Sequence, residues 1–125
     1  KQTLKLLPRL EIYQHLKAPI SSYSHGMKQK LALVSALLHK PKLLLLDEPF
    51  VGLDPKSSHE FKEIMNEFVK DGCAIFYSTH VLEVAEKICT HVVIIKNGKL
   101  IAKGEMAKVR GMKSLEKVFL ELGNE

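Results

Sequence analysis

The sequence predicts an α/β fold: a mostly parallel sheet flanked by helices, with a β-hairpin near the C-terminal end. Three observations support this. Residues 43–46 and 73–77 are short, uniformly apolar segments, amphipathic helical stretches lie before and between them, and Asn97-Gly98 is a strong hairpin signal. Strands that alternate with helices form parallel sheets with right-handed crossovers. Ligands of such sheets bind at the carboxyl ends of the strands.

The first elements are helical. Five apolar residues recur at a roughly helical spacing that Pro8 interrupts: Leu4, Leu7, Leu10, Ile12 and Leu16. A loop follows, and a second helix begins near His25. Four residues that step by four, three and four predict its apolar face: Met27, Leu31, Val34 and Leu38.

Two strands and a long helix come next. Leu43–Asp47 is too short and too apolar for a surface helix, so we predict a strand buried on both faces, as we do for residues 73–77. Between them, Asp54 and Pro55 form a cap and first turn, and Gly72 ends the helix. Its apolar stripe consists of Phe61, Ile64, Met65 and Phe68.

The remaining residues predict a helix, a third strand at 92–95, a return strand at 99–102 and a last short helix. The first of these helices carries an apolar face of Val81, Val84, Ala85 and Ile88. The last helix carries Leu115, Val118, Phe119 and Leu122.

Composition bounds the possible functions. The chain has 125 residues, 46% of them hydrophobic, and no apolar run approaches the ~20 residues that span a bilayer. The net charge is +5, yet residues 1–42 hold eight Lys or Arg and one acid, a balance of +7. This basic end either attracts nucleic acid, acidic lipid or nucleotide, or is a solvated face. Cys73 and Cys89 match no metal spacing, and we expect buried free thiols.

Polar residues gather where the predicted strands end. Asp47, Glu48, Ser78 and His80 fall at or just past the ends of two strands. An aspartate at the tip of a buried strand suits Mg²⁺, held through water, and the next carboxylate is placed to take a proton from water. The alternative is a strand exit capped by acids, and His80 has the alternative of an incidental loop residue.

The turn Ser24–Met27 opens the second helix. Gly26 allows close approach of a ligand to the backbone, the first N–H groups of the helix favour an anion, and Lys28 and Lys30 would add positive potential. The alternative is that Ser24 only caps the helix.

Taken together and in order, four segments resemble the ATP-binding subunit of an ABC transporter: "YSHGMKQK", "LLLLDE", "VGLD" and "STH". Ser24 and Gly26 look like the Ser and second Gly of the signature motif LSGGQ, and Asp47-Glu48 like the end of the Walker B strand. Asp54 looks like the D-loop aspartate, and His80 like the switch histidine. The tail "SLEKVFLEL" resembles bacterial ABC-2-type exporter ATPases.

The sequence departs from this pattern in two ways. Tyr23, His25 and Met27 replace the usual Leu, Gly and Gln of the signature, and no "GxxxxGK[ST]" P-loop occurs. P-loop amides and their Lys cradle the phosphates. The sequence therefore resembles the C-terminal half of a P-loop NTPase domain of the ABC type. We divide it into a signature-motif part (1–42), an ATPase-core part (43–104) and a C-terminal helical extension (105–125).

The resemblance implies ATP and Mg²⁺ as cofactors, with Asp47 supporting the metal and Glu48 polarising the attacking water. His80 would contact the γ-phosphate. Ser24, His25, Gly26 and Met27 would face an ATP held by a second nucleotide-binding domain, and Asp54 would couple the two sites.

The implied partners are that second domain, a copy or a paralogue, and a membrane permease. The implied place is the cytoplasmic face of the cell membrane, with no nucleic acid. The 125-residue chain is expected to be inactive alone and to self-associate. Two alternatives stay open: a non-transport ABC ATPase acting on DNA, and a basic nucleic-acid-binding module.

Overall fold

A computed structural model describes residues 6, 8–15 and 17–122, without the side chain of Tyr13. Of the apolar positions expected at the N-terminal end, Leu4, Leu7 and Leu16 lie outside the described residues, and Leu10 and Ile12 are buried. The chain divides into two compact units, residues 1–78 and 79–125, and each is described here by itself. None of the described helices has the length and apolar character needed to cross a bilayer.

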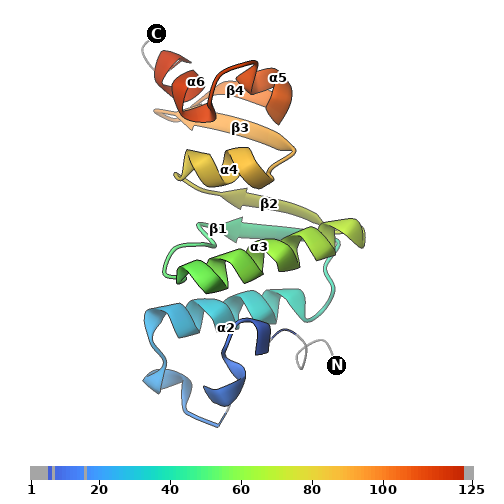
Figure 1. Ribbon diagram of the computed structural model, residues 1–125, viewed down its shortest axis with the longest axis vertical. Helices are drawn as coiled ribbons and strands as arrows, with labels where there is room; N and C mark the ends of the chain where they lie inside the picture. The colour runs from blue at the N-terminus through green and yellow to red at the C-terminus, as the bar shows by residue number, and fades with distance from the viewer. Residues whose placement is uncertain (1–5, 7, 16, 123–125) are drawn as a thin grey trace. The chain divides into compact units, whose positions relative to one another are not determined.

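In the described part of unit 1, Leu6, Pro8 and Arg9 are helical, and two strands, two further α-helices and two short 3-10 helices follow (Figure 1). In chain order these are η1 (Tyr13–His15), η2 (Ile20–Ser22), α2 (His25–Leu37), β1 (Leu43–Asp47), α3 (Pro55–Lys70) and β2 (Ala74–Ser78). The strands pair in parallel, from Leu43 opposite Ala74 to Asp47 opposite Ser78. The predicted order of helix, strand, helix and strand is confirmed.

Helix α3 forms as its sequence predicts. Asp54 caps it by accepting a hydrogen bond from the Ser57 backbone N–H at 3.2 Å, Pro55 occupies the first turn, and Gly72 follows the end of the helix with φ +99°. The four apolar side chains of the predicted stripe are all buried: Phe61, Ile64, Met65 and Phe68. In Figure 1, α3 is drawn between α2 and the β1–β2 pair.

The apolar face predicted for α2 is right only at Val34. The buried side chains are Lys30, Leu33, Val34 and Leu37, whereas Met27, Leu31 and Leu38 are only half-buried. Residues 31–38 are apolar at nearly every position, so more than one face satisfies the helical period. Packing selects a face rotated from the predicted one, and it turns Lys30 inward.

The two strands are buried on one face, not on both as predicted. Leu44 is 5% exposed, while Leu43 and Leu45 on the opposite face are 57% and 68% exposed, and Phe76 of β2 is 60% exposed. Helix α3 packs against one face of the sheet. Because successive side chains of a strand point to opposite faces, every second residue is covered and those between are exposed. The described residues of unit 1 thus leave one apolar face of the β1–β2 pair open.

Unit 2 contains a hairpin and three short helices: α4 (Leu82–Ile88), β3 (His91–Lys96), β4 (Lys99–Glu105), α5 (Met106–Arg110) and α6 (Leu115–Leu122). Asn97 and Gly98 form the turn with φ of +52° and +75°, which confirms the predicted hairpin. Among the described residues β3 pairs with β4 alone, so parallel pairing is confined to β1 and β2.

A small core holds unit 2 together: Ala85, Ile94, Met106, Leu115 and Val118. Helix α5 had no counterpart in the sequence prediction. Of the apolar face predicted for α4, only Ala85 is buried. Val81 precedes the helix and is 41% exposed. Both cysteines are free thiols as predicted; Cys73 is buried and Cys89 partly buried.

Candidate functional site

The carboxyl ends of β1 and β2 bring three of the predicted site residues together. Asp47 and Ser78 lie opposite each other in the parallel register, and the Ser78 hydroxyl donates a hydrogen bond to the Asp47 carboxylate. Glu48 follows directly, and its backbone N–H donates to the Ser78 carbonyl at 3.0 Å and to Ser78 Oγ at 3.2 Å. The Asp47 carboxylate and the Glu48 backbone are thereby held at one edge of the sheet.

The backbone at Glu48 turns the chain away from β1. Its φ of +45° lies in the left-handed region, which non-glycine residues seldom adopt. Asp47 is exposed and Glu48 half-buried, so both carboxylates stand at the surface of unit 1. An exposed carboxylate beside a hydroxyl offers the hard oxygen donors that Mg²⁺ prefers, so the residues fit this metal.

An aromatic group anchors the loop that follows. The Phe50 ring makes edge contacts with Phe61 of α3 and Tyr77 of β2, with ring centroids 5.7 and 5.8 Å apart. Backbone hydrogen bonds from Val51 to Glu48 and from Leu53 to Phe50 close two turns within the loop, at 3.3 and 3.2 Å. The loop is thus ordered between β1 and α3.

The turn before α2 is a capped helix N-terminus. Ser24 Oγ accepts a hydrogen bond from the Met27 backbone N–H at 3.2 Å, so the capping interpretation of Ser24 holds whatever else the residue does. Ser24 and His25 are exposed, and Gly26 and Met27 are half-buried. A side chain at Gly26 would place its Cβ 2.7 Å from the Gly52 carbonyl oxygen. Gly26 therefore has a packing role besides the one predicted.

Lys30 does not join the positive potential expected at this turn. It is 9% exposed, and its Nζ lies 3.4 Å from Asp54 Oδ1. Of the two lysines predicted to face an anion, only Lys28 is exposed. Lys30 is buried because the buried face of α2 is rotated from the predicted one and includes this lysine.

Asp54 has a lowered pKa of about 2, first because the Ser57 side chain and backbone N–H face its carboxylate, and then because Lys30 is near. Ser57 is buried, and in the described part of the chain its Oγ has no partner of good hydrogen-bond geometry. The hydroxyl dipole, rather than a well-formed bond, thus accounts for the first effect.

His80 belongs to unit 2, where it is exposed and precedes α4. Its predicted contact with a γ-phosphate stays a prediction, as do the roles assigned to the other site residues.

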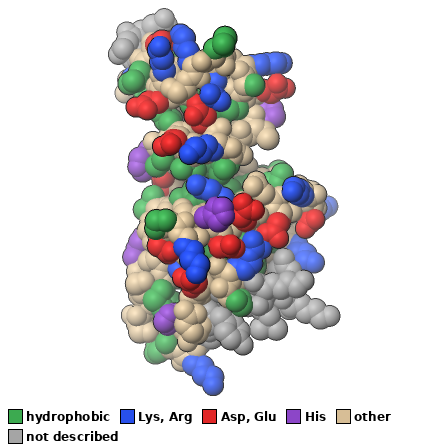
Figure 2. Space-filling model, viewed as in Figure 1, with side chains coloured by type: hydrophobic (Ala, Val, Ile, Leu, Met, Phe, Trp, Pro, Cys, Tyr) green, Lys and Arg blue, Asp and Glu red, His purple; other side chains and the backbone are tan. Residues whose placement is uncertain are grey.

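The basic N-terminal part is partly neutralised within unit 1. Arg9 pairs with Glu60 at 3.0 Å and with Glu67 at 2.6 Å, and Lys30 lies 3.4 Å from Asp54. Figure 2 shows basic and acidic side chains interspersed on the visible face. These pairs favour the interpretation of the basic end as a solvated face over that of a nucleic-acid-binding surface.

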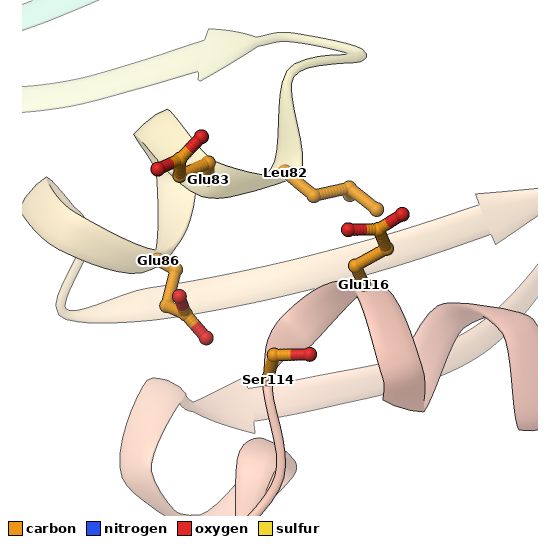
Figure 3. Close-up of a pocket in the computed structure, with 5 residues that line it drawn as sticks. All are labelled: Leu82, Glu83, Glu86, Ser114 and Glu116. Carbon is orange, nitrogen blue, oxygen red and sulfur yellow. The ribbon is translucent and has the colours of Figure 1, made fainter.

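A shallow pocket in unit 2 is a poor candidate for a nucleotide site. Figure 3 shows its lining, which consists of Leu82, Glu83, Glu86, Ser114 and Glu116. The Glu86 carboxylate accepts hydrogen bonds from Arg110 Nε and from the Leu115 backbone N–H, both at 2.8 Å, and so ties α4 to the start of α6. Three glutamates would repel a phosphate.

Sequence reasoning missed the residues that join α2 to the loop after β1. Gln29 Nε2 donates to the Pro49 carbonyl oxygen at 3.1 Å, and Lys30 reaches Asp54. Gly52, at φ +86°, lies against the His25 ring, because a Cβ there would come within 2.8 Å of His25 Cδ2. A basic residue in helical register with Leu33, Val34 and Leu37 was the signal that could have indicated Lys30.

Comparison with known proteins indicates the family of the chain. A family model described as "AAA domain, putative AbiEii toxin, Type IV TA system" matches residues 14–86. The ABC transporter ATP-binding protein YxlF of Bacillus subtilis is 44% identical over 106 residues, which are 85% of this chain and 36% of that protein. The ABC-type transporter ATP-binding protein EcsA of the same organism is 38% identical over 130 residues, 100% of this chain and 53% of EcsA.

Solved structures give the same relationship. One, described as "Structure of ATP binding subunit of ABC transporter", is 38% identical with a TM-score of 0.92. The match covers 98% of this chain and 53% of the chain in that structure. An ATP-binding cassette of an ABC transporter, 22% identical with a TM-score of 0.70, shares the fold. The chain thus spans about half the length of the relatives it matches, or less.

Proposed function

Since this chain belongs to the AAA-domain family and is part of an ABC transporter ATP-binding protein, we propose that it supplies the signature turn and the hydrolytic carboxylates of an ATPase that powers transport. The observation that carries the proposal is the cluster at the sheet edge. There Ser78 of β2 holds Asp47 of β1, and its carbonyl and hydroxyl oxygens both hold the Glu48 backbone.

In the proposed mechanism each carboxylate has its own task. Asp47 would hold Mg²⁺, and this ion, when bound, would neutralise negative charge on the phosphates. Glu48 orients the attacking water and accepts its proton, because it is the adjacent carboxylate and its backbone is fixed by Ser78. His80 donates a hydrogen bond to a γ-phosphate oxygen.

The signature turn acts on a different ATP. Ser24, His25, Gly26 and Met27 form the N-terminal turn of α2, in which Ser24 Oγ accepts the Met27 N–H and the helix dipole favours an anion. In the proposal these groups meet the γ-phosphate of an ATP whose β- and γ-phosphates are cradled by a second nucleotide-binding domain. Asp54, at the start of α3, links the two sites.

The proposed partners are that second domain and a membrane permease, with the ATPase at the cytoplasmic face of the membrane. Hydrolysis would be coupled to closure and opening of the two domains. Neither the ion pairs of the basic end nor the relatives compared favour a DNA-acting ATPase.

Glu48→Gln in the full-length protein tests the assignment of the base. The amide cannot accept the proton of water, so ATP turnover should fall by about 10²-fold or more while ATP binding persists. Glu63→Gln removes an exposed glutamate of α3 and is the matched control. Steady-state hydrolysis and nucleotide binding by calorimetry measure both effects. If the Glu48 variant turns over ATP at the rate of the Glu63 control, the proposal is wrong.

A further inference from the structure

The start of α2 is fastened to the loop 49–54 by three neighbouring contacts. The backbone of Gly26 lies against the Gly52 carbonyl with no room for a Cβ. One turn further along the helix, Gln29 Nε2 donates to the Pro49 carbonyl oxygen at 3.1 Å, and Lys30 Nζ lies 3.4 Å from Asp54 Oδ1. The contacts therefore reach both ends of the loop and its middle.

The Lys30 contact differs from an ordinary surface ion pair. The side chain of Lys30 is 11% exposed, whereas that of Asp54 is 49% exposed. Withdrawing an ammonium group from water is unfavourable unless a partner compensates, and an aliphatic side chain of similar length would fill the same space without that cost. Its charge, directed at Asp54, therefore distinguishes Lys30 from an apolar residue packed at the same place.

Asp54 connects two helices through its two carboxylate oxygens. Oδ1 faces Lys30 of α2, and Oδ2 accepts the hydrogen bond of the Ser57 backbone N–H that caps α3. A change in the position of α2 is therefore transmitted to the carboxylate and to the first turn of α3. The loop cannot shift independently of the signature turn while both contacts hold.

We propose that Lys30 is a positioning residue that fixes the loop 49–54 to α2, so that the signature turn and Asp54 act as one body when a partner's ATP binds at the turn. The inference rests on the function proposed above. Lys30 contacts no phosphate in this proposal; it acts through Asp54. Gln29 supports it from the other end of the loop.

Amide hydrogen exchange in the full-length protein tests the fastening directly. In Lys30→Met, which keeps the length and volume of the side chain but not its charge, the amides of Val51 and Leu53 should exchange at least about fivefold faster. Lys30→Arg restores the charge and should return the exchange to within about twofold of the parent. Lys42→Met, which removes the charge of an exposed lysine before β1, is the matched control and should change neither amide.

Steady-state kinetics supply a second readout. The turnover number of Lys30→Met should fall by about tenfold with KM for ATP unchanged, because the defect lies in the placement of groups that act during closure. Lys30→Arg should recover most of this loss. A residue that merely supports the fold would lower the melting temperature and leave turnover per folded molecule intact.

The outcomes separate the possibilities. Unchanged exchange of Val51 and Leu53 in Lys30→Met, or a rise in KM with constant turnover number, overturns the proposal; the second result would make Lys30 a ligand of phosphate. Where Lys30→Met does not fold, Gln29→Leu removes only the neutral contact, and it should still speed the exchange of Val51. Absence of any Glu48-dependent ATPase activity would refute the proposed function. The hydrogen-exchange data would still show whether Lys30 holds the loop 49–54 to α2.

Discussion

The open face of the β1–β2 pair predicts self-association of the 125-residue chain. Leu43 and Leu45 of β1 stand beside Phe76 of β2 on the face that no described element of unit 1 covers, and they are 57%, 68% and 60% exposed. Replacing Leu45, the central residue, by lysine puts a charge in the middle of this face. We expect the parent chain to associate through the face and Leu45→Lys to be mainly monomeric.

The exposed fractions set the size of the effect. Complete burial of a Leu or Phe side chain stabilises by about 1.5–3 kcal/mol, and about six-tenths of each of the three remains exposed, so about 3–5 kcal/mol per copy is available. Two copies together could gain about 6–10 kcal/mol, which is similar to the estimated cost of about 4–15 kcal/mol for lost freedom on association. The surplus is at most about 6 kcal/mol, so weak association is expected, with a Kd of tens of micromolar at the tightest.

Sedimentation equilibrium over a range of concentrations is the assay. The control is Leu120→Lys, which makes the same replacement at a leucine of α6 that is 56% exposed. This control should associate like the parent. A parent chain that stays monomeric at about 200 μM, or a Leu45 variant that associates as strongly as the Leu120 control, would refute the reasoning.

Three further predictions follow from the site. Ser24→Arg in the full-length protein should block domain closure and reduce ATP turnover by about 10²-fold or more, while ATP affinity of the isolated subunit stays within about twofold, because the turn serves the partner's ATP. Asp54→Asn should destabilise the chain at neutral pH and lose this effect as pH falls from about 3.8 to about 2, since a carboxyl with a lowered pKa stabilises the fold only while ionised. The 125-residue chain alone should neither bind Mg-ATP tightly nor hydrolyse it, because no P-loop occurs in its sequence.

Each of these has a result that contradicts it. The Ser24 prediction is contradicted if calorimetry on the monomeric variant shows a large loss of ATP affinity. The Asp54 prediction is contradicted if urea unfolding at several pH values shows a constant difference in the free energy of unfolding between variant and parent down to pH ~2. For the 125-residue chain, metal-dependent turnover that disappears in Glu48→Gln would contradict the last prediction, since a contaminating ATPase would not respond to that substitution.

Much of the fold and of the candidate site could be predicted because the signals are local. The Asp54-Pro55 start of α3 and the Asn97-Gly98 turn depend on the backbone preferences of a few adjacent residues, and both form as predicted. The position of Asp47, Glu48 and Ser78 at one edge follows from parallel pairing of two short apolar segments. Ordered motifs along the chain were sufficient to indicate the family.

Other features were decided only by tertiary packing. Sequence alone could not choose among the apolar faces of α2, nor tell that one face of β1 has no cover, because both depend on residues distant along the chain. The same holds for Lys30. By its position it could equally have faced a phosphate, and only the packing of α2 beside the loop 49–54 directs its charge to Asp54. Periodicity gives the residues that can share a face, and contacts between elements determine which of those faces is buried.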